Sequence, residues 1–322
     1  MKKLTFPRGG RYLLGGFVVL LLAIMVFAAQ DNGPNFSPWS EAVNIGPVVN
    51  SSYYDACPTI SKSGLSLYFR SNRPGGQGGF DIWVSQRDSL EDPWEAPINL
   101  GPTINGPSNE YCSTFSFDGH WMIFVSDRPG GYGSYDLYIS HRKDKRDDFG
   151  WETPENVGPL VNSSAMENGP CLFNDGATGQ TLLYYSSGRP GGLGGLDIYV
   201  SLVVLDKDGI FVGPPSPVAE LNTSYPDYQP ALRKDGLEIF FASYRPGGIG
   251  GVDLWASIRE TTLDLWSPPV NLGSLVNSTA YDFHPTLSWD GTTLTFASER
   301  AGGEGQADLY MCTRTKLKGP EK

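Results

Sequence analysis

One cassette occurs five times along this chain, and in each copy an arginine precedes an aspartate by eight residues across a glycine-rich loop. The copies read SNRPGGQGGFDIW, SDRPGGYGSYDLY, SGRPGGLGGLDIY, SYRPGGIGGVDLW and SERAGGEGQADLY, and their arginines lie 55, 61, 56 and 55 residues apart. The pairs are Arg73 and Asp81, Arg128 and Asp136, Arg189 and Asp197, Arg245 and Asp253, and Arg300 and Asp308. Such a period is typical of arrays in which each unit needs its neighbours.

Each repeat reads as four short strands. In the second repeat they lie within residues 93–101, 103–117, 120–127 and 135–142, and Asp118-Gly119 favours a two-residue hairpin turn. The 40 Gly and 25 Pro of the chain suit many short strands joined by turns. Four antiparallel strands per repeat, arranged radially, describe a propeller blade. We therefore predict an all-β, five-bladed β-propeller over residues 39–315, followed by a short polar tail at 316–322.

The ends of the repeat region predict how the ring closes. The fifth cassette ends after its fourth strand with no outer strand behind it, whereas PWSEAVNIG at 38–46 is an outer strand with no earlier blade. Residues 39–46 are thus expected to complete the fifth blade. Closure of this kind hides strand edges that would otherwise pair with other chains.

The cassette resembles the WD-like, PD-type and TolB-like β-propeller repeats of bacterial exported proteins. The resemblance rests on S-x-DG-x-x-L-x-F-x-S-x-R-P-G-G-x-G-G-x-D-[IL]-[WY] and covers residues 39–315 in five copies. It implies a propeller fold and a tendency to bind proteins, and it implies no particular reaction.

The first 29 residues have a different composition. Four basic residues precede an uncharged stretch at 12–29 that ends in small residues, which is typical of a secretory signal or an amino-terminal membrane anchor. We expect residues 30–38 to be a linker and the propeller to lie outside the cytoplasm, periplasmic or at the cell surface. Without residues 1–29 the chain holds 20 Lys and Arg against 35 Asp and Glu, a net charge of −15, which disfavours nucleic acid.

An acid begins the innermost strand of every repeat, five residues after an asparagine. We call these acids the ring acids: Asp55, Glu110, Glu167, Asp227 and Asp282. The asparagines are Asn50, Asn105, Asn162, Asn222 and Asn277, and we expect them to brace loops. Hairpin pairing places each ring acid beside its cassette's arginine, whose planar fork can serve two carboxylates. We therefore predict an acid–Arg–Asp cluster in every blade, on what we call the acid face.

Aromatic residues accompany the ring acids. They are Tyr53, Tyr54, Tyr111, Tyr228, Tyr281 and Phe283. Aromatic side chains beside charge suit protein or peptide partners, so the sequence favours a monomeric binding or scaffold module that uses the acid face and its RPGG loops. The alternative is a glycan-active hydrolase of five-bladed propeller type that uses two ring carboxylates. Fivefold repetition favours the non-enzymatic function, because catalysis needs different residues in different roles.

The position two residues after each ring acid breaks the repetition. We call these the waist positions: Cys57, Cys112, Gly169, Gln229 and His284. Two cysteines and a histidine could ligate zinc or copper, but they come from different blades, so we expect no metal ion and no cofactor. A disulfide between Cys57 and Cys112 is disfavoured because neighbouring inner strands usually lie beyond the ~7 Å Cα limit. All four cysteines are expected to be small buried side chains.

Overall fold

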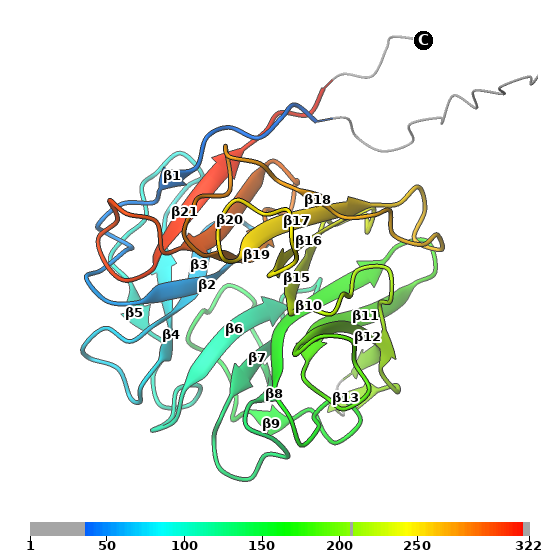
Figure 1. The fold of residues 1–322 in the computed structure, drawn as a ribbon. Coiled ribbons are helices and arrows are strands. Elements are labelled where there is room, and N and C mark those ends of the chain that lie inside the picture. The colour runs from blue at the N-terminus through cyan, green and yellow to red at the C-terminus, as the bar shows by residue number, and fades with distance from the viewer. Residues whose placement is uncertain (1–35, 207–208, 318–322) are drawn as a thin grey trace, which may run out of the picture. The chain divides into compact units, whose positions relative to one another are not determined.

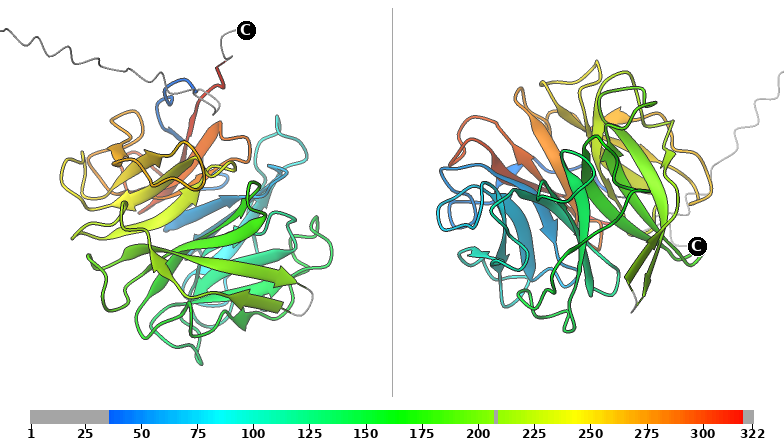
Figure 2. Two further views of the ribbon diagram at one scale, coloured as in Figure 1. Left: turned by 90° about the vertical axis from the view of Figure 1, so that its right-hand side faces the viewer. Right: turned by 90° about the horizontal axis from the view of Figure 1, so that it is seen from below.

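Each cassette folds into one antiparallel sheet, and five such sheets lie around a central channel (Figure 1, Figure 2). The computed structural model describes residues 36–206 and 209–317. The predicted all-β, five-bladed propeller is confirmed, and the described residues contain no helix long and apolar enough to cross a membrane. The expected leader at 1–29, residues 30–35 of the expected linker and residues 318–322 of the expected tail lie outside the described residues.

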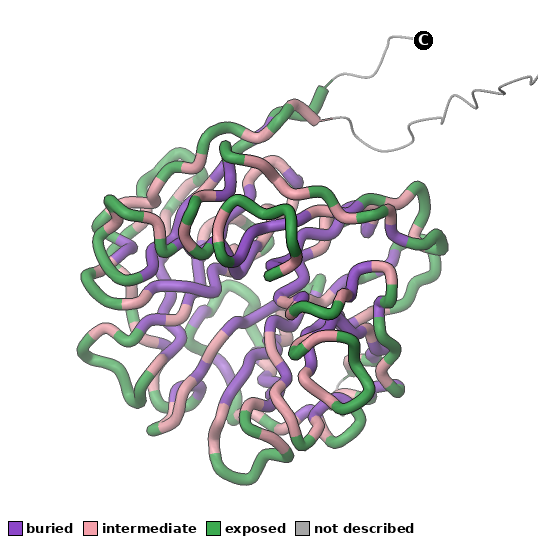
Figure 3. The backbone as a smooth tube through the Cα atoms, in the orientation of Figure 1, coloured by how far each residue is buried: buried purple, intermediate pink, exposed green. Residues whose placement is uncertain are grey.

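The first two blades have the same order of strands from the channel outward. Blade 1 consists of β2 (Asp55–Ile60), β3 (Ser66–Ser71), β4 (Asp81–Gln86) and β5 (Ile98–Asn99). Blade 2 consists of β6 (Glu110–Phe115), β7 (Trp121–Ser126), β8 (Asp136–His141) and β9 (Glu155–Asn156). The inner three strands of each blade are mostly buried and the connecting loops are exposed (Figure 3).

The third and fourth blades keep this order with one extension. Blade 3 consists of β10 (Glu167–Asp175), β11 (Gln180–Ser187), β12 (Asp197–Asp206) and β14 (Ser216–Pro217). The additional strand β13 (Gly209–Val212) pairs with the far end of β12. Blade 4 consists of β15 (Asp227–Leu232), β16 (Glu238–Ser243), β17 (Asp253–Ile258) and β18 (Val270–Asn271).

Blade 5 combines the two ends of the repeat region. It consists of β19 (Asp282–Leu287), β20 (Thr293–Ser298), β21 (Asp308–Thr313) and the amino-terminal strand β1 (Val43–Asn44). Val43 pairs with Met311 and Asn44 with Tyr310, in the antiparallel sense. The predicted closure of the ring by the amino-terminal strand is thus confirmed.

Apolar side chains make up much of the packing between blades. Tyr68 and Ile82 of blade 1, for example, belong to one buried cluster with Met122 and Phe124 of blade 2. Burying a side chain of this size contributes roughly 1.5–3 kcal/mol. A single blade exposes one such face on each side, which is why the cassette cannot stand alone.

A glycine in the glycine-rich loop of each cassette sets how closely consecutive blades approach. At Gly78 a Cβ would lie 2.0 Å from the carbonyl oxygen of Ser108 in the next blade, and at Gly305 it would lie 2.0 Å from that of Tyr53. The equivalent residues Gly133, Gly194 and Gly250 meet the next blade's backbone in the same way. The repeated glycine is therefore explained by backbone contact between blades.

Candidate functional site

The ring acids lie against the arginines of their own blades. In blade 1, Asp55 Oδ1 lies 2.6 Å from the guanidinium of Arg73, and Asp55 Oδ2 accepts hydrogen bonds from the backbone and hydroxyl of Ser51. The same guanidinium donates to the carbonyl of Val49, and its Nε donates to Ser71. One arginine thus joins the loop before the inner strand to the end of the second strand.

All five blades repeat this ion pair, and all five ring acids have no exposed surface. The bridges join Arg73 to Asp55 (2.6 Å), Arg128 to Glu110 (3.2 Å), Arg189 to Glu167 (3.5 Å), Arg245 to Asp227 (2.6 Å) and Arg300 to Asp282 (2.6 Å). An enclosed carboxylate that accepts several hydrogen bonds has little freedom to meet a ligand. Any role of these residues in binding remains a prediction.

The aspartate eight residues after each arginine has a different partner from the one expected. Asp81 does not share the guanidinium of Arg73; it accepts the backbone N–H groups of Gln77 and Gly78 and the side-chain amide of Asn99. Asp136, Asp197, Asp253 and Asp308 accept loop N–H groups in the same way. The expected acid–Arg–Asp cluster is therefore two separate structures, an ion pair and a carboxylate that holds the glycine-rich loop.

The expected aromatic residues divide into two groups. Tyr53 and Tyr281 are 40% and 42% exposed, whereas Tyr54, Tyr111, Tyr228 and Phe283 are more enclosed. The guanidinium of Arg70 lies 5.2 Å from the ring of Tyr54 and 4.6 Å from that of Tyr111. Burial raises the pKa of Tyr54 to about 12, so its hydroxyl stays neutral and donates to Glu299.

The carboxyl of Glu110 lies in surroundings that shift its pKa. Burial raises the pKa of its carboxyl above the ordinary value, and this effect outweighs the hydrogen bonds from Gly106 and Ser126 and the charge of Arg128. A carboxyl with a raised pKa can keep a proton, as general-acid catalysis requires. The sequence did not indicate this shift, because the five acids occupy equivalent positions.

The waist positions narrow the channel because the backbone turns inward there. Cys57, Cys112, Gln229 and His284 have φ between 34° and 58°, and Gly169 has φ of 57°. Each waist position lies where the pairing of the inner strand with the second strand shifts register. This bulge points four side chains at the channel axis, and the fifth waist position, Gly169, has no side chain.

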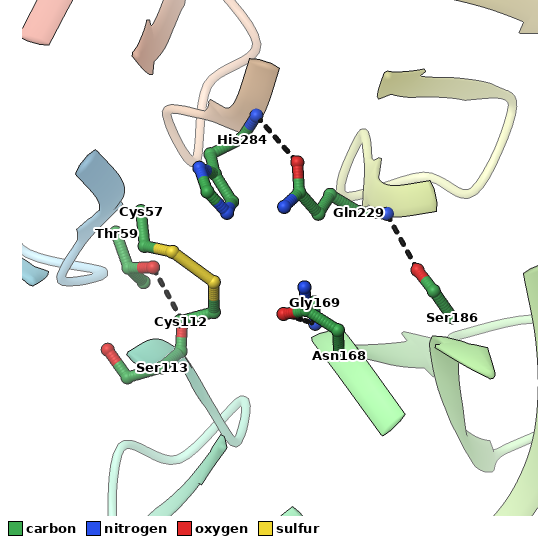
Figure 4. Close-up of a disulfide and its surroundings, with 9 residues drawn as sticks. All are labelled: Cys57, Thr59, Cys112, Ser113, Asn168, Gly169, Ser186, Gln229 and His284. Atoms are coloured by element: carbon green, nitrogen blue, oxygen red, sulfur yellow. Dashed lines mark hydrogen bonds between the residues drawn. A yellow bond between two sulfur atoms is a disulfide. The ribbon is translucent and has the colours of Figure 1, made fainter. Parts of the chain in front are cut away.

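Cys57 and Cys112 form a disulfide, and their Cα atoms are 4.8 Å apart (Figure 4). The expectation that neighbouring inner strands are too far apart was therefore wrong, because the bulges bring these residues closer than regular strands would come. Cys312 is buried as expected, whereas Cys171 is partly exposed.

His284 completes the waist beside the disulfide. It is 6% exposed, and neither ring nitrogen has a hydrogen-bond partner among the described residues. Its backbone N–H donates to Gln229 Oε1 at 2.9 Å, and Figure 4 shows the imidazole facing the disulfide. Burial lowers the pKa of His284 well below its ordinary value, and the charge of Arg70 lowers it further, so the imidazole is neutral.

The opposite end of the channel holds a pocket that sequence reasoning missed. We call this end the turn face, because it is built from the five hairpin turns between first and second strands. Four residues of these turns and Asn174, next to last in β10, line a cavity of about 130 Å³. These residues, which we call the variable turn residues, are Lys62, Phe117, Asn174, Lys234 and Trp289.

Two aromatic rings dominate this pocket. Phe117 and Trp289 lie with ring centroids 5.2 Å apart, although they come from blades 2 and 5. Lys62 Nζ lies 3.7 Å from the centroid of Phe117 and 4.7 Å from that of Trp289, and Lys234 Nζ lies 5.2 Å from the latter. The sequence signal was present: these five positions carry four different residue types, whereas their neighbours repeat.

No protein-family model and no curated protein matches this chain. Solved structures do match. An α-L-arabinofuranosidase from Podospora anserina in complex with cellotriose has a TM-score of 0.54 at 12% identity, with 86% of this chain and 98% of that one covered. An α-L-arabinofuranosidase from Lactobacillus brevis has a TM-score of 0.56 at 14% identity, covering 85% and 94%.

Two further structures bear on the expectations from sequence. A GH62 hydrolase in complex with xylotriose has a TM-score of 0.54 at 13% identity, covering 85% of this chain and 97% of that one. A putative TolB from Agrobacterium tumefaciens, at 16% identity and covering 88% and 100%, has a TM-score of 0.46, which is too low to carry an argument.

At these identities the similarity establishes the five-bladed fold. The similar structures are mostly glycoside hydrolases, and this contradicts the expectation of a scaffold for protein or peptide partners on the acid face.

Proposed function

We propose that this protein is a glycan-directed propeller whose saccharide ligand binds at the turn face, against Phe117 and Trp289. The observation that carries this proposal is the convergence of the five variable turn residues on one cavity. The repeated residues around them are occupied by ion pairs, loop hydrogen bonds and contacts between blades. The variable turn residues have no such repeated role, so they are free to select a ligand.

The chemistry of the pocket suits a sugar. The C–H face of a pyranose or furanose ring packs on aromatic rings, and the hydroxyl groups at its edge need hydrogen-bonding partners. Phe117 and Trp289 supply the apolar surface, and Lys62, Lys234 and Asn174 supply polar groups around it. The cellotriose and xylotriose named with two similar structures make neutral pentose and hexose oligosaccharides the first ligands to test.

Isothermal titration calorimetry with xylotriose, cellotriose and arabinose-substituted xylo-oligosaccharides tests the proposal. We expect saturable binding by the wild type and at least a tenfold weaker affinity in Trp289→Ala and in Phe117→Ala. Phe211→Ala is the matched control, because Phe211 is an exposed phenylalanine on β13, 64% exposed, outside the pocket. No binding of any of these saccharides, or equal losses in all three variants, would contradict the proposal.

Hydrolysis of the glycan by ring acids is the second candidate function, and the similarity of fold to arabinofuranosidases favours it. Within the ring, Glu110 with its raised pKa is the residue suited to act as the acid. The full enclosure of all five ring acids and their ion pairs argues against it. We therefore rank saccharide binding at the turn face first.

The two candidate functions predict different release of reducing sugar by the same variants. Release of reducing sugar from arabinoxylan would be measured for the wild type, Glu110→Gln and Trp289→Ala. Hydrolysis at the acid face predicts release that Glu110→Gln abolishes, with saccharide affinity at the turn face unchanged. Binding without catalysis predicts no release above the rate without protein.

We further propose that the chain belongs to the WD-like, TolB-like repeat family and that it is exported as a monomer. The five cassettes and the basic, then apolar, amino terminus support this. Amino-terminal sequencing of the protein recovered from outside the cytoplasm tests the export proposal, since a cleaved leader predicts a start at Ala29 or Gln30.

A further inference from the structure

The channel waist contains three metal-ligating side chains that the saccharide pocket does not use. One donor atom each from Cys57, Cys112 and His284 lies within 4.8 Å of the others, and all three residues are buried. They come from β2, β6 and β19, so only the closed ring brings them together. Figure 4 shows the imidazole directed at the two sulfur atoms.

Two independent observations indicate that this cluster is built to hold a ligand. First, His284 is 94% buried with both ring nitrogens unpartnered among the described residues, a costly arrangement for a polar side chain unless something binds there. Second, a cavity of about 60 Å³ lies against the three residues. That volume exceeds the roughly 10–15 Å³ that a cavity needs to hold one water molecule.

We propose that Cys57, Cys112 and His284 bind one zinc ion when the disulfide is reduced, and that the disulfide is the metal-free form of the same site. Two thiolates, one imidazole and a fourth position left to water make a tetrahedral set that zinc accepts. Two thiolate charges balance the charge of Zn²⁺, so the buried site is neutral overall, as a channel interior requires.

Electrons and protons are conserved both in the reduction of the disulfide and in the binding of zinc. A dithiol reductant gives two electrons and two protons to the Cys57–Cys112 bond, which becomes two thiols while the reductant becomes a disulfide. Zn²⁺ then replaces the two thiol protons, which leave to solvent, and forms two Zn–S bonds and one Zn–N bond. The thiol pair can therefore be oxidised or metal-bound, and the two states exclude each other.

The channel offers the ion a route from the turn face. The cavity at the waist and the turn-face pocket share the lining residues Thr59, Thr114, Cys171, Ala231 and Thr286. The backbone at the waist is set by bulges in every blade, including blades that carry glycine or glutamine there. Reduction of the disulfide therefore leaves the fold of the waist in place.

The experiment uses the full chain, reduced with a phosphine so that no added thiol competes for the metal. We expect the reduced protein to bind one Zn²⁺ per chain by competition with a chromophoric chelator, and the oxidised protein to bind none. Co²⁺ in place of Zn²⁺ is expected to give thiolate-to-metal charge-transfer absorption and the visible bands of tetrahedral cobalt.

Two variants test which residues bind the zinc ion. His284→Gln should weaken Zn²⁺ binding at least a hundredfold without unfolding the protein, because Gln229 already occupies the equivalent waist position with the same backbone conformation. Cys171→Ser with Cys312→Ser removes both free cysteines and should leave the stoichiometry at one. Far-ultraviolet circular dichroism and the oxidised Tm of each variant verify that it is folded.

Three results would overturn the proposal. They are a reduced wild type that binds Zn²⁺ no better than His284→Gln, cobalt absorption without thiolate bands, and loss of binding in the variant that lacks Cys171 and Cys312. None of these readouts involves a saccharide, so the zinc site and the proposed glycan function are tested separately.

Discussion

Asn50 holds Leu309 through both ends of its side-chain amide: the backbone N–H of Leu309 donates to Asn50 Oδ1 at 2.8 Å, and Asn50 Nδ2 donates to the Leu309 carbonyl at 3.0 Å. The two residues are 259 positions apart, and their contact joins the loop before blade 1 to blade 5. Asn105 makes the same pair of hydrogen bonds to Ile82 between blades 1 and 2. The side chain thus acts as a two-ended clamp between consecutive blades.

Removing this clamp is expected to destabilise the ring. Asn50→Ala leaves the buried N–H of Leu309 without its partner, whereas the Leu309 carbonyl keeps the N–H of Ile45, so we expect a loss of about 1–3 kcal/mol in the free energy of unfolding. Urea denaturation measures it. Asn174→Ala, at an exposed amide of the turn face, is the control and should change stability by less than about 0.5 kcal/mol. Equal losses in the two variants would contradict the clamp.

The glycine that contacts the next blade's backbone gives a second prediction. Gly305→Ala places a Cβ against the Tyr53 carbonyl, so the loop or the blade must move, and we expect a loss of about 1–3 kcal/mol. Gly176→Ala is the matched control, because nothing lies within 4 Å of a Cβ at that position. Thermal unfolding of the two variants should show a lower Tm for the first alone; a control with an equal fall would show that the contact is not the cause.

The raised pKa of Glu110 predicts that stability falls as the pH rises. Between the ordinary carboxyl pKa and the raised one, the folded protein keeps a proton that the unfolded chain has lost, so stability falls as the pH rises through that window. Glu110→Gln cannot titrate. The wild type should therefore lose stability relative to this variant as the pH rises from about 4, measured by denaturation at a series of pH values.

Asp118 is the control, because we expect its effect on the pH dependence of stability to have the opposite sign. Burial acts to raise its pKa, but hydrogen bonds from Ser116 and from the backbone of His120 outweigh burial and lower it. The wild type should therefore lose stability relative to Asp118→Asn as the pH falls through the lowered pKa. Parallel slopes for the two carboxyl variants would contradict the assignment of either shift.

The disulfide between blades 1 and 2 closes a separation of 55 residues. By chain entropy such a cross-link contributes up to about 4 kcal/mol. We expect the double variant Cys57→Ala, Cys112→Ala to unfold at lower urea than the wild type under non-reducing conditions and to match reduced wild type. The pair Cys171→Ala, Cys312→Ala tests whether loss of any two cysteines has this effect; it should leave the response to reductant intact.

The repeat predicted the blades and their closure because one period and one unpaired outer strand determine both. It did not predict the partner of Asp81, since spacing places that aspartate near both the guanidinium of Arg73 and the N–H groups of the loop. Which of these two partners Asp81 binds depends on the backbone conformation of the loop. A carboxylate four residues after Gln77 receives the N–H groups of Gln77 and Gly78 directly.

The disulfide was missed for a related reason. Regular inner strands would hold Cys57 and Cys112 apart, and the bulge that brings them together is a backbone feature. A hint was present in the sequence, because proline follows the waist position at Pro58, Pro170, Pro230 and Pro285. Proline interrupts regular strand pairing and favours such bulges.

The turns that carry Lys62, Phe117, Asn174, Lys234 and Trp289 have a consequence for changing what the molecule recognises. None of these five side chains is buried, so we expect each to be exchangeable without disturbing the ring. Randomising these five codons alone would yield a library of pockets on one unaltered frame. The ligand selectivity of the molecule could then be changed at five positions without changing the residues that determine its fold.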